Sequence, residues 1–177
     1  LLPPAAYTMI NQLHEQGVAP SKKTWLYEAS GLADYPDFWK NVQDSAKSML
    51  TFGLYHPDMP LLPLGQTVAK AYQAGTNRPL NRLMFQGADS LFLIAEAIRT
   101  AGSTAPDKMI AALQKIEWVG TRGTVSFSQE KGYKYQQWLN VPYVTLQVTK
   151  VNQPIDEMQL VQGPGKPIDP TKLSKAE

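Results

Sequence analysis

The chain has 177 residues, of which 43% are hydrophobic and 18% are charged, and its formal net charge is +2. This composition indicates a globular protein of one domain or two small ones and excludes an intrinsically disordered chain. Lys and Arg are scattered rather than clustered, so we expect no nucleic-acid partner. The absence of cysteine excludes disulfides and thiolate sites, and two distant histidines, His14 and His56, argue against zinc, so no cofactor or metal is expected.

The first residues of the chain resemble the last residues of a strand that begins upstream. Leu1 and Leu2 stand at the N-terminus without an initiator Met, and two such leucines are typical of the end of a buried strand. We therefore expect the chain to be a fragment whose front part is absent.

The first third of the chain predicts helices that alternate with strands. Apolar residues at helical spacing from Ala6 to Leu13 predict an amphipathic helix, and Gly17 stands where such a helix ends. Asp34 is placed to cap a second helix, whose first turn contains Pro36. In chain order we expect a helix at 5–16, a strand at 24–27, a helix at 36–47 and a strand at 48–55.

The middle of the chain predicts a proline-rich crossing followed by three helices. The segment 56–64, HPDMPLLPL, contains three prolines and cannot form a helix or a central strand. Gly75 is expected to end the first helix, and Thr104 to begin the third as part of a capping box. The second helix is apolar over most of its circumference, so we expect it to be packed on several sides. The three helices are expected at 65–74, 87–101 and 104–115.

The last part of the chain predicts two strands and a tail. Alternating residues predict strands at 123–128 and 140–148, which we expect to pair after a turn at QEKG. The final 27 residues contain four prolines, so we expect them to be extended or loose.

Strands that alternate with helices indicate an α/β protein with a parallel sheet. The crossing at 56–64 suggests two lobes that share the chain, with a hinge motion around a cleft. In this interpretation the chain divides into 1–55 in lobe 2, a hinge crossing at 56–64, 65–122 in lobe 1, crossing strands at 123–150 that return to lobe 2, and an extended C-terminal tail at 151–177.

Four segments carry a resemblance to a known family: INQLHEQGV, WLYEASGLAD, DFWKNVQDSAKSMLTFGLYHPD and, most specifically, GADSLFLIAEAIRTAGSTAPDKMIAALQKIEWVGTRGTVSFS. Their order resembles that of the solute-binding proteins of branched-chain amino-acid ABC transporters, which have the type I periplasmic binding fold. The likeness rests on order and spacing over most of the chain and corresponds to the C-terminal half of such a protein. GAD stands where the family commonly has Tyr-Asp, and the tail from Val151 has no counterpart in the family.

The resemblance implies a binding protein that is periplasmic or extracellular and membrane-associated, with an ABC permease as its partner. It implies a small-molecule ligand, namely a branched-chain or other amino acid, an amide or an aromatic acid. It also implies that the N-terminal half of the same protein is missing from this chain and completes the two lobes.

Glu28 is the chief candidate for a ligand contact. It follows the apolar residues Trp25, Leu26 and Tyr27 at the expected end of a strand, and strand ends line the crevice of open α/β sheets. The resemblance implies that Glu28 is the family's amino-group-binding acid, which gives a ligand ammonium a charge-assisted hydrogen bond. The alternative is a loop acid that is solvated or paired with a nearby Lys. In the open form we expect the carboxylate to be solvated.

Five further residues are candidates for the ligand site. Tyr27 and Ser30 flank the acid, although a tyrosine at a strand end is also typical of packing. Phe85 and Gln86 precede the second helix of the middle region, at a loop that in the family reaches the cleft, and Phe85 suits either a ligand wall or the core. Tyr55 lies at the hinge crossing.

Three classes of function stay open at this point. A non-enzymatic ligand-capture protein for an importer is favoured by the resemblance. An enzyme would use Glu28 or Asp34 as general acid or base, but no set of nucleophile, base and orienting residue is visible, so we expect none. A receptor or regulator of the same fold would bind a ligand to sense it, since fold does not fix function.

Overall fold

The computed structural model describes residues 2–174 of the chain. The chain divides into two units, which we call unit 1 (Leu1–Met59 with Tyr143–Glu177) and unit 2 (Pro60–Pro142). It passes from unit 1 to unit 2 within the proline-rich segment 56–64 and returns after Pro142, inside the expected crossing strands. In the described part of the chain, no helix combines the length and the apolar character needed to cross a membrane.

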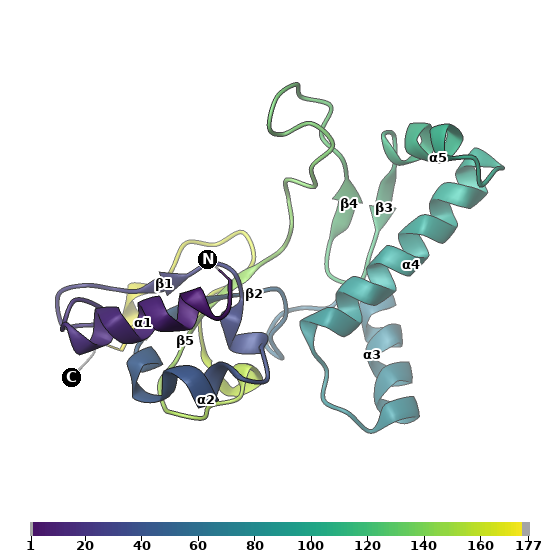
Figure 1. The fold of residues 1–177 in the computed structure, drawn as a ribbon. Coiled ribbons are helices and arrows are strands. Elements are labelled where there is room, and N and C mark those ends of the chain that lie inside the picture. The colour runs from purple at the N-terminus through teal and green to yellow at the C-terminus, as the bar shows by residue number, and fades with distance from the viewer. Residues whose placement is uncertain (1, 175–177) are drawn as a thin grey trace. The chain divides into compact units, whose positions relative to one another are not determined.

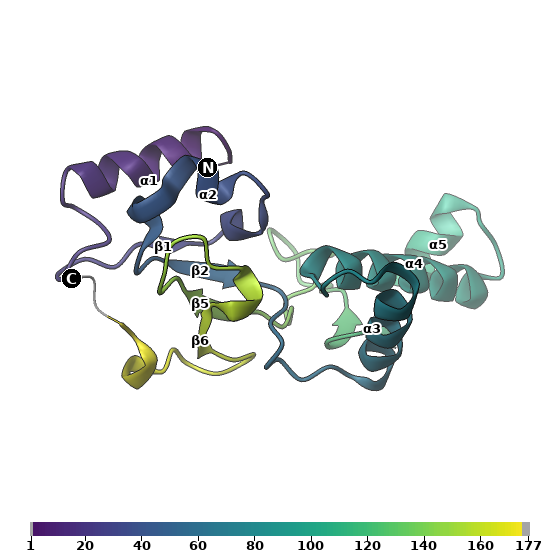
Figure 2. The same cartoon turned by 90° about the horizontal axis from the view of Figure 1, so that it is seen from below.

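Unit 1 is built on a four-stranded sheet in the order β1-β2-β5-β6 (Figures 1 and 2). Its strands are β1 (Tyr27–Glu28), β2 (Leu50–Gly53), β5 (Val144–Gln147) and β6 (Gln159–Gln162). The pair β1–β2 is parallel, whereas β2–β5 and β5–β6 are antiparallel. The α/β class is confirmed, but the sheet is mixed rather than parallel, since β5 runs antiparallel to both of its neighbours.

Helices α1 (Ala5–Glu15) and α2 (Phe38–Val42) enclose the core of unit 1 together with β5. Gly17 follows α1 with φ of 64°, as expected of a glycine that ends a helix. The phenol of Tyr7 donates a hydrogen bond of 3.0 Å to Asp37 and thereby ties α1 to the segment before α2. The core residues from these elements are Ala6, Tyr7, Ile10, Phe38, Val42, Val144 and Leu146, and Val148, which follows β5, belongs to the same core.

Three expectations for unit 1 are corrected. The strand expected at 24–27 is reduced to Tyr27–Glu28, because only this part lies opposite β2. The helix expected at 36–47 is divided into α2 and a 3₁₀ helix at Gln43–Ala46, where Gln43 has φ of 42° and interrupts the α-helix. Asp34 caps no helix, because it belongs to a 3₁₀ turn at Leu32–Asp34.

The described part of the C-terminal tail, residues 151–174, belongs to the folded unit rather than being extended or loose. It contains 3₁₀ helices at Ile155–Glu157 and Pro170–Lys172, and it supplies β6, which pairs with β5. Met158 and Val161 are buried, so the tail contributes apolar side chains to the core despite its prolines.

Unit 2 contains helices α3 (Pro63–Thr76), α4 (Arg82–Ala101) and α5 (Pro106–Leu113) and a hairpin of β3 (Glu117–Val119) and β4 (Thr124–Ser126). Figure 1 shows the hairpin beside α4. Asp89 of α4 is buried and accepts hydrogen bonds from the hairpin turn, which gives this acid a structural role.

Several expectations for unit 2 are also corrected. Helix α3 continues past Gly75 to a left-handed cap at Asn77, and α4 begins earlier than expected because Asn81 caps it by accepting a hydrogen bond from the backbone N–H of Met84. Helix α5 begins after Ala105, and Thr104 makes no capping box. The strand expected at 123–128 is β4 and pairs with β3, which the sequence analysis missed, instead of with the strand expected at 140–148.

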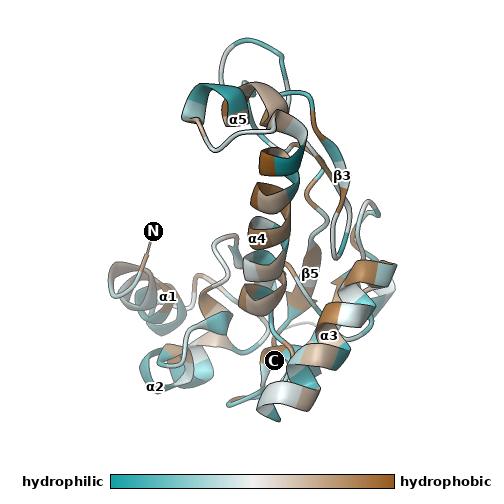
Figure 3. Cartoon of the chain, turned by 90° about the vertical axis from the view of Figure 1, so that its right-hand side faces the viewer, coloured by the Kyte–Doolittle hydropathy of each residue, from teal (hydrophilic) through white to brown (hydrophobic). Residues whose placement is uncertain are grey.

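Helix α4 carries an apolar surface that unit 2 leaves uncovered. Leu83, Leu91 and Ile94 are 65%, 67% and 49% exposed. They lie on one side of the helix, since their spacing brings them near the same angular position. Figure 3 shows hydrophobic residues in brown along α4. The expectation that this helix is packed on several sides is therefore wrong for the described chain. We call these three residues the α4 stripe.

Candidate functional site

The carboxylate of Glu28 is buried and held by four hydrogen bonds. Oε2 accepts from the backbone N–H of Leu32 at 2.8 Å and from the hydroxyl of Thr51 at 3.0 Å. Oε1 accepts from both the backbone N–H and the hydroxyl of Ser30. We call these four donors the Glu28 cradle. Two of these partners are backbone N–H groups, which can only donate, and two are hydroxyls, so each carboxylate oxygen has two partners.

The sequence explains how these donors converge. Glu28 and Thr51 are direct partners in the parallel pairing of β1 with β2, so their side chains leave the sheet on the same face. The chain then turns at Gly31, whose φ of 73° lies in the left-handed region that glycine adopts without strain. This turn directs the amides of Ser30 and Leu32 back towards the acid.

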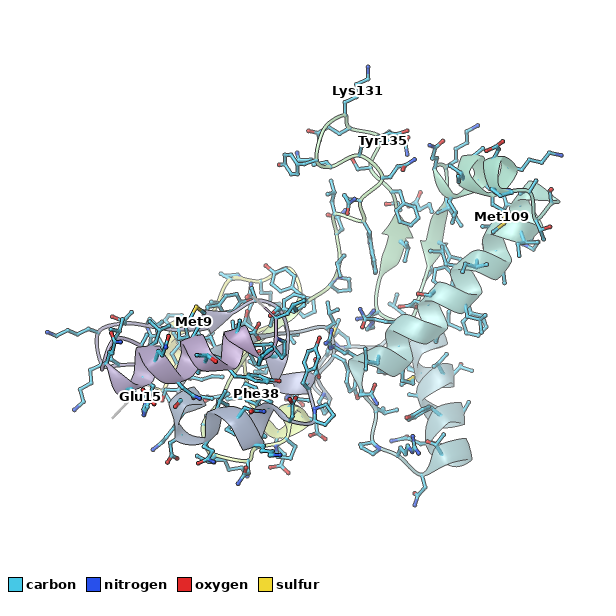
Figure 4. All side chains as sticks on the ribbon, in the orientation of Figure 1. Met9, Glu15, Phe38, Met109, Lys131 and Tyr135 are labelled. Atoms are coloured by element: carbon cyan, nitrogen blue, oxygen red, sulfur yellow. The ribbon has the colours of Figure 1, made fainter. Side chains whose placement is uncertain are left out.

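A pocket of about 360 Å³ lies beside the cradle. Figure 4 labels Met9, which belongs to the helix that forms one wall. The pocket is mostly apolar, and Glu28 gives it one charged group. Its lining comes from α1 (Ala6, Met9, Ile10) and from the segment around β1 (Leu26, Tyr27, Glu28, Ala29, Ser30, Leu32).

The structure corrects the expected environment of Glu28. The residue is only 9% exposed, so it is neither a solvated loop acid nor solvated at the edge of a cleft. Burial of a carboxylate is costly unless hydrogen bonds replace water, and the cradle supplies them. A carboxylate that lines an apolar pocket can attract a cationic group.

Three of the other residues predicted for the ligand site lie in unit 1 with Glu28, but not all of them contact it or line its pocket. Ser30 belongs to the cradle, and Tyr27 lines the same pocket while 43% of it is exposed. Tyr55 follows β2 and does not line this pocket. Burial, and secondarily the charge of Asp156, raise the pKa of the Tyr55 phenol.

Phe85 and Gln86 belong to unit 2 and lie within α4 rather than in a loop before it. Phe85 is fully buried in the first turns of this helix, and Gln86 is half-buried. Their expected position on a loop was wrong because the cap at Asn81 begins the helix earlier. Their contact with a ligand remains a prediction.

Thr51 was missed by the sequence analysis, although it is fully buried and bonds to Glu28. A threonine in the apolar strand LTFG is the only signal available in the sequence, and such a residue is also common in ordinary strands. Its role depends on the register between two strands, which the pattern of a single strand does not give.

Two other hollows among the described residues lack this combination of apolar surface and buried charge. One of about 530 Å³ in unit 1 is lined by His56, Lys172 and exposed acids of the tail, and His56 bonds to the carbonyl of Met158 at 3.1 Å. One of about 190 Å³ in unit 2 is lined by Ile110, Leu113 and Phe127 among others. Within residues 2–174, no group of three or more His, Asp or Glu side chains is placed to hold a metal ion.

Comparison with solved structures identifies the fold. A leucine binding protein from Thermotoga maritima superimposes with a TM-score of 0.66 at 18% identity, over 96% of this chain and 43% of that protein. A branched-chain amino acid transporter substrate binding protein from Streptococcus pneumoniae, in complex with isoleucine, gives a TM-score of 0.60 at 14% identity, over 89% and 42% of the two chains. A solute binding protein from Rhodopseudomonas palustris, in complex with benzoate, gives 0.53 at 13% identity, over 91% and 40%.

The chain spans less than half the length of these solved proteins, and no curated protein matches its sequence. The family model described as periplasmic binding protein matches residues 1–145, which is most of the chain. The resemblance proposed from the sequence is therefore confirmed, together with the type I fold. The chain belongs to the periplasmic binding protein family.

Proposed function

We propose that this chain is part of the extracytoplasmic solute-binding component of an ABC importer, and that it captures an amino acid or a related small carboxylate at the Glu28 pocket. Units 1 and 2 then correspond to lobes 2 and 1. The observation that carries the proposal is the Glu28 cradle, a buried, fully hydrogen-bonded carboxylate beside an apolar pocket. The solved relatives in complex with isoleucine and benzoate support a small carboxylate as the class of ligand.

The chemistry of the pocket favours a ligand with an ammonium group over a simple carboxylic acid. A hydrogen bond between an ammonium and a carboxylate is charge-assisted and stronger than a neutral one. A ligand carboxylate placed beside Glu28 would instead meet a like charge. The apolar side chains of Met9 and Ile10 suit an aliphatic side chain in the same pocket.

The proposal also names partners. The permease of the importer receives the ligand, so the protein acts outside the cytoplasm and next to the membrane. Because the solved relatives are more than twice the length covered here, we infer that further chain of the same protein packs on the α4 stripe. We use the term whole protein for these 177 residues together with any chain that the protein carries outside them.

A sensing receptor of the same fold is the second candidate function, because it would bind the same ligand in the same pocket. Co-purification of the whole protein with membrane permease subunits, and stimulation of solute uptake by membrane vesicles, distinguish an importer component from a sensor.

Isothermal titration of the whole protein with leucine and with benzoate tests the proposal. Glu28→Gln preserves size but removes the charge, so leucine affinity should fall about 10- to 100-fold, from the strength of a hydrogen bond to a charged group. Benzoate affinity should be unchanged or higher, because a like charge has been removed.

Glu15→Gln is the matched control, since Glu15 is an exposed acid at the end of α1, labelled in Figure 4, and does not line the pocket. Because Glu28 is buried and bonded, its variant is also expected to lose stability, so near-ultraviolet circular dichroism must establish that it is folded at the titration temperature. Equal leucine affinity in the wild type and in folded Glu28→Gln would contradict the proposed role. Turnover of the ligand into a product would overturn the binding-protein function itself.

A further inference from the structure

We propose that Thr51 is a positioning residue for ligand recognition: its hydroxyl fixes the Glu28 carboxylate in the one orientation that presents its charge to the pocket. The inference rests on the proposed function, because it explains how the pocket selects a ligand that carries an ammonium group. Thr51 itself is not among the residues that line the pocket.

The geometry of the sheet makes Thr51 a rigid support. It is fully buried in β2, where it lies opposite Glu28 in the parallel register. The backbone of β2 is held on both sides, by β1 and by β5, so the hydroxyl has little freedom to move. Its hydrogen bond of 3.0 Å to Oε2 therefore attaches the acid to the centre of the sheet.

The other donors of the cradle are less rigid, because they belong to the loop that follows β1. The backbone N–H groups of Ser30 and Leu32 and the hydroxyl of Ser30 all lie within four residues of the acid. A glutamate has several rotatable bonds, so a local loop and a local acid can shift together. Thr51 is 23 positions away in the sequence, and its hydrogen bond is the one in the cradle that holds Glu28, and with it the loop, at a fixed position on the sheet.

Loss of this hydroxyl should change the orientation of the Glu28 carboxylate more than the shape of the pocket. Valine has nearly the volume of threonine, so Thr51→Val leaves the β2 backbone and the apolar lining in place while Oε2 loses one of its two donors. The carboxylate then samples orientations that do not face a ligand ammonium, and the amides of Ser30 and Leu32 lose a fixed acceptor. Thr51→Ser restores a hydroxyl at the same position.

Thr145→Val provides a matched control within the same sheet. Thr145 is buried in β5, and its hydroxyl donates to Gln162 on the neighbouring strand rather than to Glu28. The two valine variants thus remove one buried strand hydroxyl each, and only one of them touches the cradle. Any general effect of a lost hydroxyl on folding should be common to both.

The experiment measures ligand affinity and amide hydrogen exchange in the whole protein for the wild type and these three variants. Thr51→Val should bind leucine about 10-fold more weakly, which is less than removal of a full charge would cause. Its affinity for benzoate should be unchanged, and Thr51→Ser should recover most of the leucine affinity. Exchange at Ser30 and Leu32 should accelerate in Thr51→Val but not in Thr145→Val. In a Glu28→Gln background, Thr51→Val should have no further effect on leucine affinity, because the charge it positions is gone.

The outcomes separate this inference from the proposed function. If the wild type binds leucine, and Thr51→Val leaves both the leucine affinity and the exchange of Ser30 and Leu32 unchanged, the positioning role is overturned while the function stands. An equal loss of affinity for leucine and benzoate, or the same loss in Thr145→Val, would reduce Thr51 to a structural residue. If the wild type binds no amino acid, the proposed ligand class fails, and unchanged exchange in Thr51→Val would then also overturn the attachment of Glu28 by Thr51.

Discussion

Asp89 accepts hydrogen bonds from both the backbone N–H and the hydroxyl of Thr121, at 2.7 and 2.8 Å. The same carboxylate forms an ion pair of 3.3 Å with Arg122, whose side chain is 2% exposed. Burial lowers the pKa of the Arg122 guanidinium, and Asp89 opposes that effect. Asp89 on α4 therefore accepts the hydrogen bonds that Thr121 donates from the turn of the β3–β4 hairpin, and its negative charge balances the buried Arg122.

Asp89→Asn should destabilise unit 2 because it removes the negative charge that pairs with the buried Arg122. Removal of one partner from a buried ion pair costs on the order of 3 kcal/mol. Native-state hydrogen exchange of the whole protein should show the loss in peptides from α4 and the hairpin. Glu96→Gln is the control on the same helix, because Glu96 pairs with the exposed Arg99 and should change nothing measurable. Equal protection in the two variants would contradict the structural role of Asp89.

Gly65 and Gly75 lie on the same helix and should respond oppositely to alanine. A Cβ on Gly65 would lie 2.2 Å from the carbonyl oxygen of Thr121, whereas a Cβ on Gly75 meets nothing within 4 Å. Gly65→Ala must therefore displace α3 from the hairpin turn and should cost about 1–3 kcal/mol or more. Gly75→Ala should be neutral or stabilise by about 0.5–1 kcal/mol, because alanine favours the helix. Urea unfolding of both variants measures the difference, and similar stabilities would refute this packing of α3.

Tyr7 makes the stability of unit 1 sensitive to alkaline pH. Burial, followed by the hydrogen bond to Asp37, raises the pKa of this phenol from 10.0 to about 12. The unfolded chain therefore loses this proton at lower pH than the folded chain. The stabilising contribution is complete below pH 10 and is lost as the pH rises from 10 to about 12.

Tyr7→Phe should therefore have a flatter stability profile than the wild type in this range of pH. At pH 8 it should be less stable by about 1 kcal/mol, for the lost hydrogen bond. Chemical unfolding at a series of pH values provides the measurement, and the tyrosinate absorbance locates the titration. Tyr133→Phe is the control, because Tyr133 is 88% exposed and its replacement should leave the profile as steep as in the wild type. A profile in Tyr7→Phe as steep as in the wild type would reject this assignment.

The sequence predicted local elements better than their partners in the sheet. Helix α1 and its ending at Gly17 follow from apolar spacing and one glycine, and these signals lie within a few residues. The partner of β4 was wrong because alternation identifies a strand without saying which strand lies beside it. The prolines of the tail concealed β6, whose few apolar residues are buried by pairing with β5 rather than by any local pattern.

The candidate site shows the same limit. Glu28 could be selected because an acid directly follows an apolar run, and this needs only neighbouring residues. Its burial could not be predicted, because Thr51 joins it only through the register of two strands, and the amides of Ser30 and Leu32 only through the turn at Gly31. Phe85 was assigned to a loop because the cap at Asn81 was overlooked.

The α4 stripe should behave differently in the isolated chain and in the whole protein. In the isolated 177 residues, Leu91→Gln replaces a side chain that is 67% exposed, so it should reduce self-association and barely change stability. In the whole protein, where we infer that further chain covers the stripe, the same change buries a polar amide and should cost about 1–3 kcal/mol. Sedimentation of the isolated chain and thermal unfolding of the whole protein provide the two measurements.

Thr100→Gln is the control for this comparison, because Thr100 is exposed on the opposite side of α4, nine positions along the helix from Leu91. It should be neutral in both forms of the protein, since Thr100 is exposed and does not belong to the α4 stripe. If Leu91→Gln is as neutral as Thr100→Gln in the whole protein, the stripe stays exposed to solvent there, and the inferred packing of further chain on α4 is wrong.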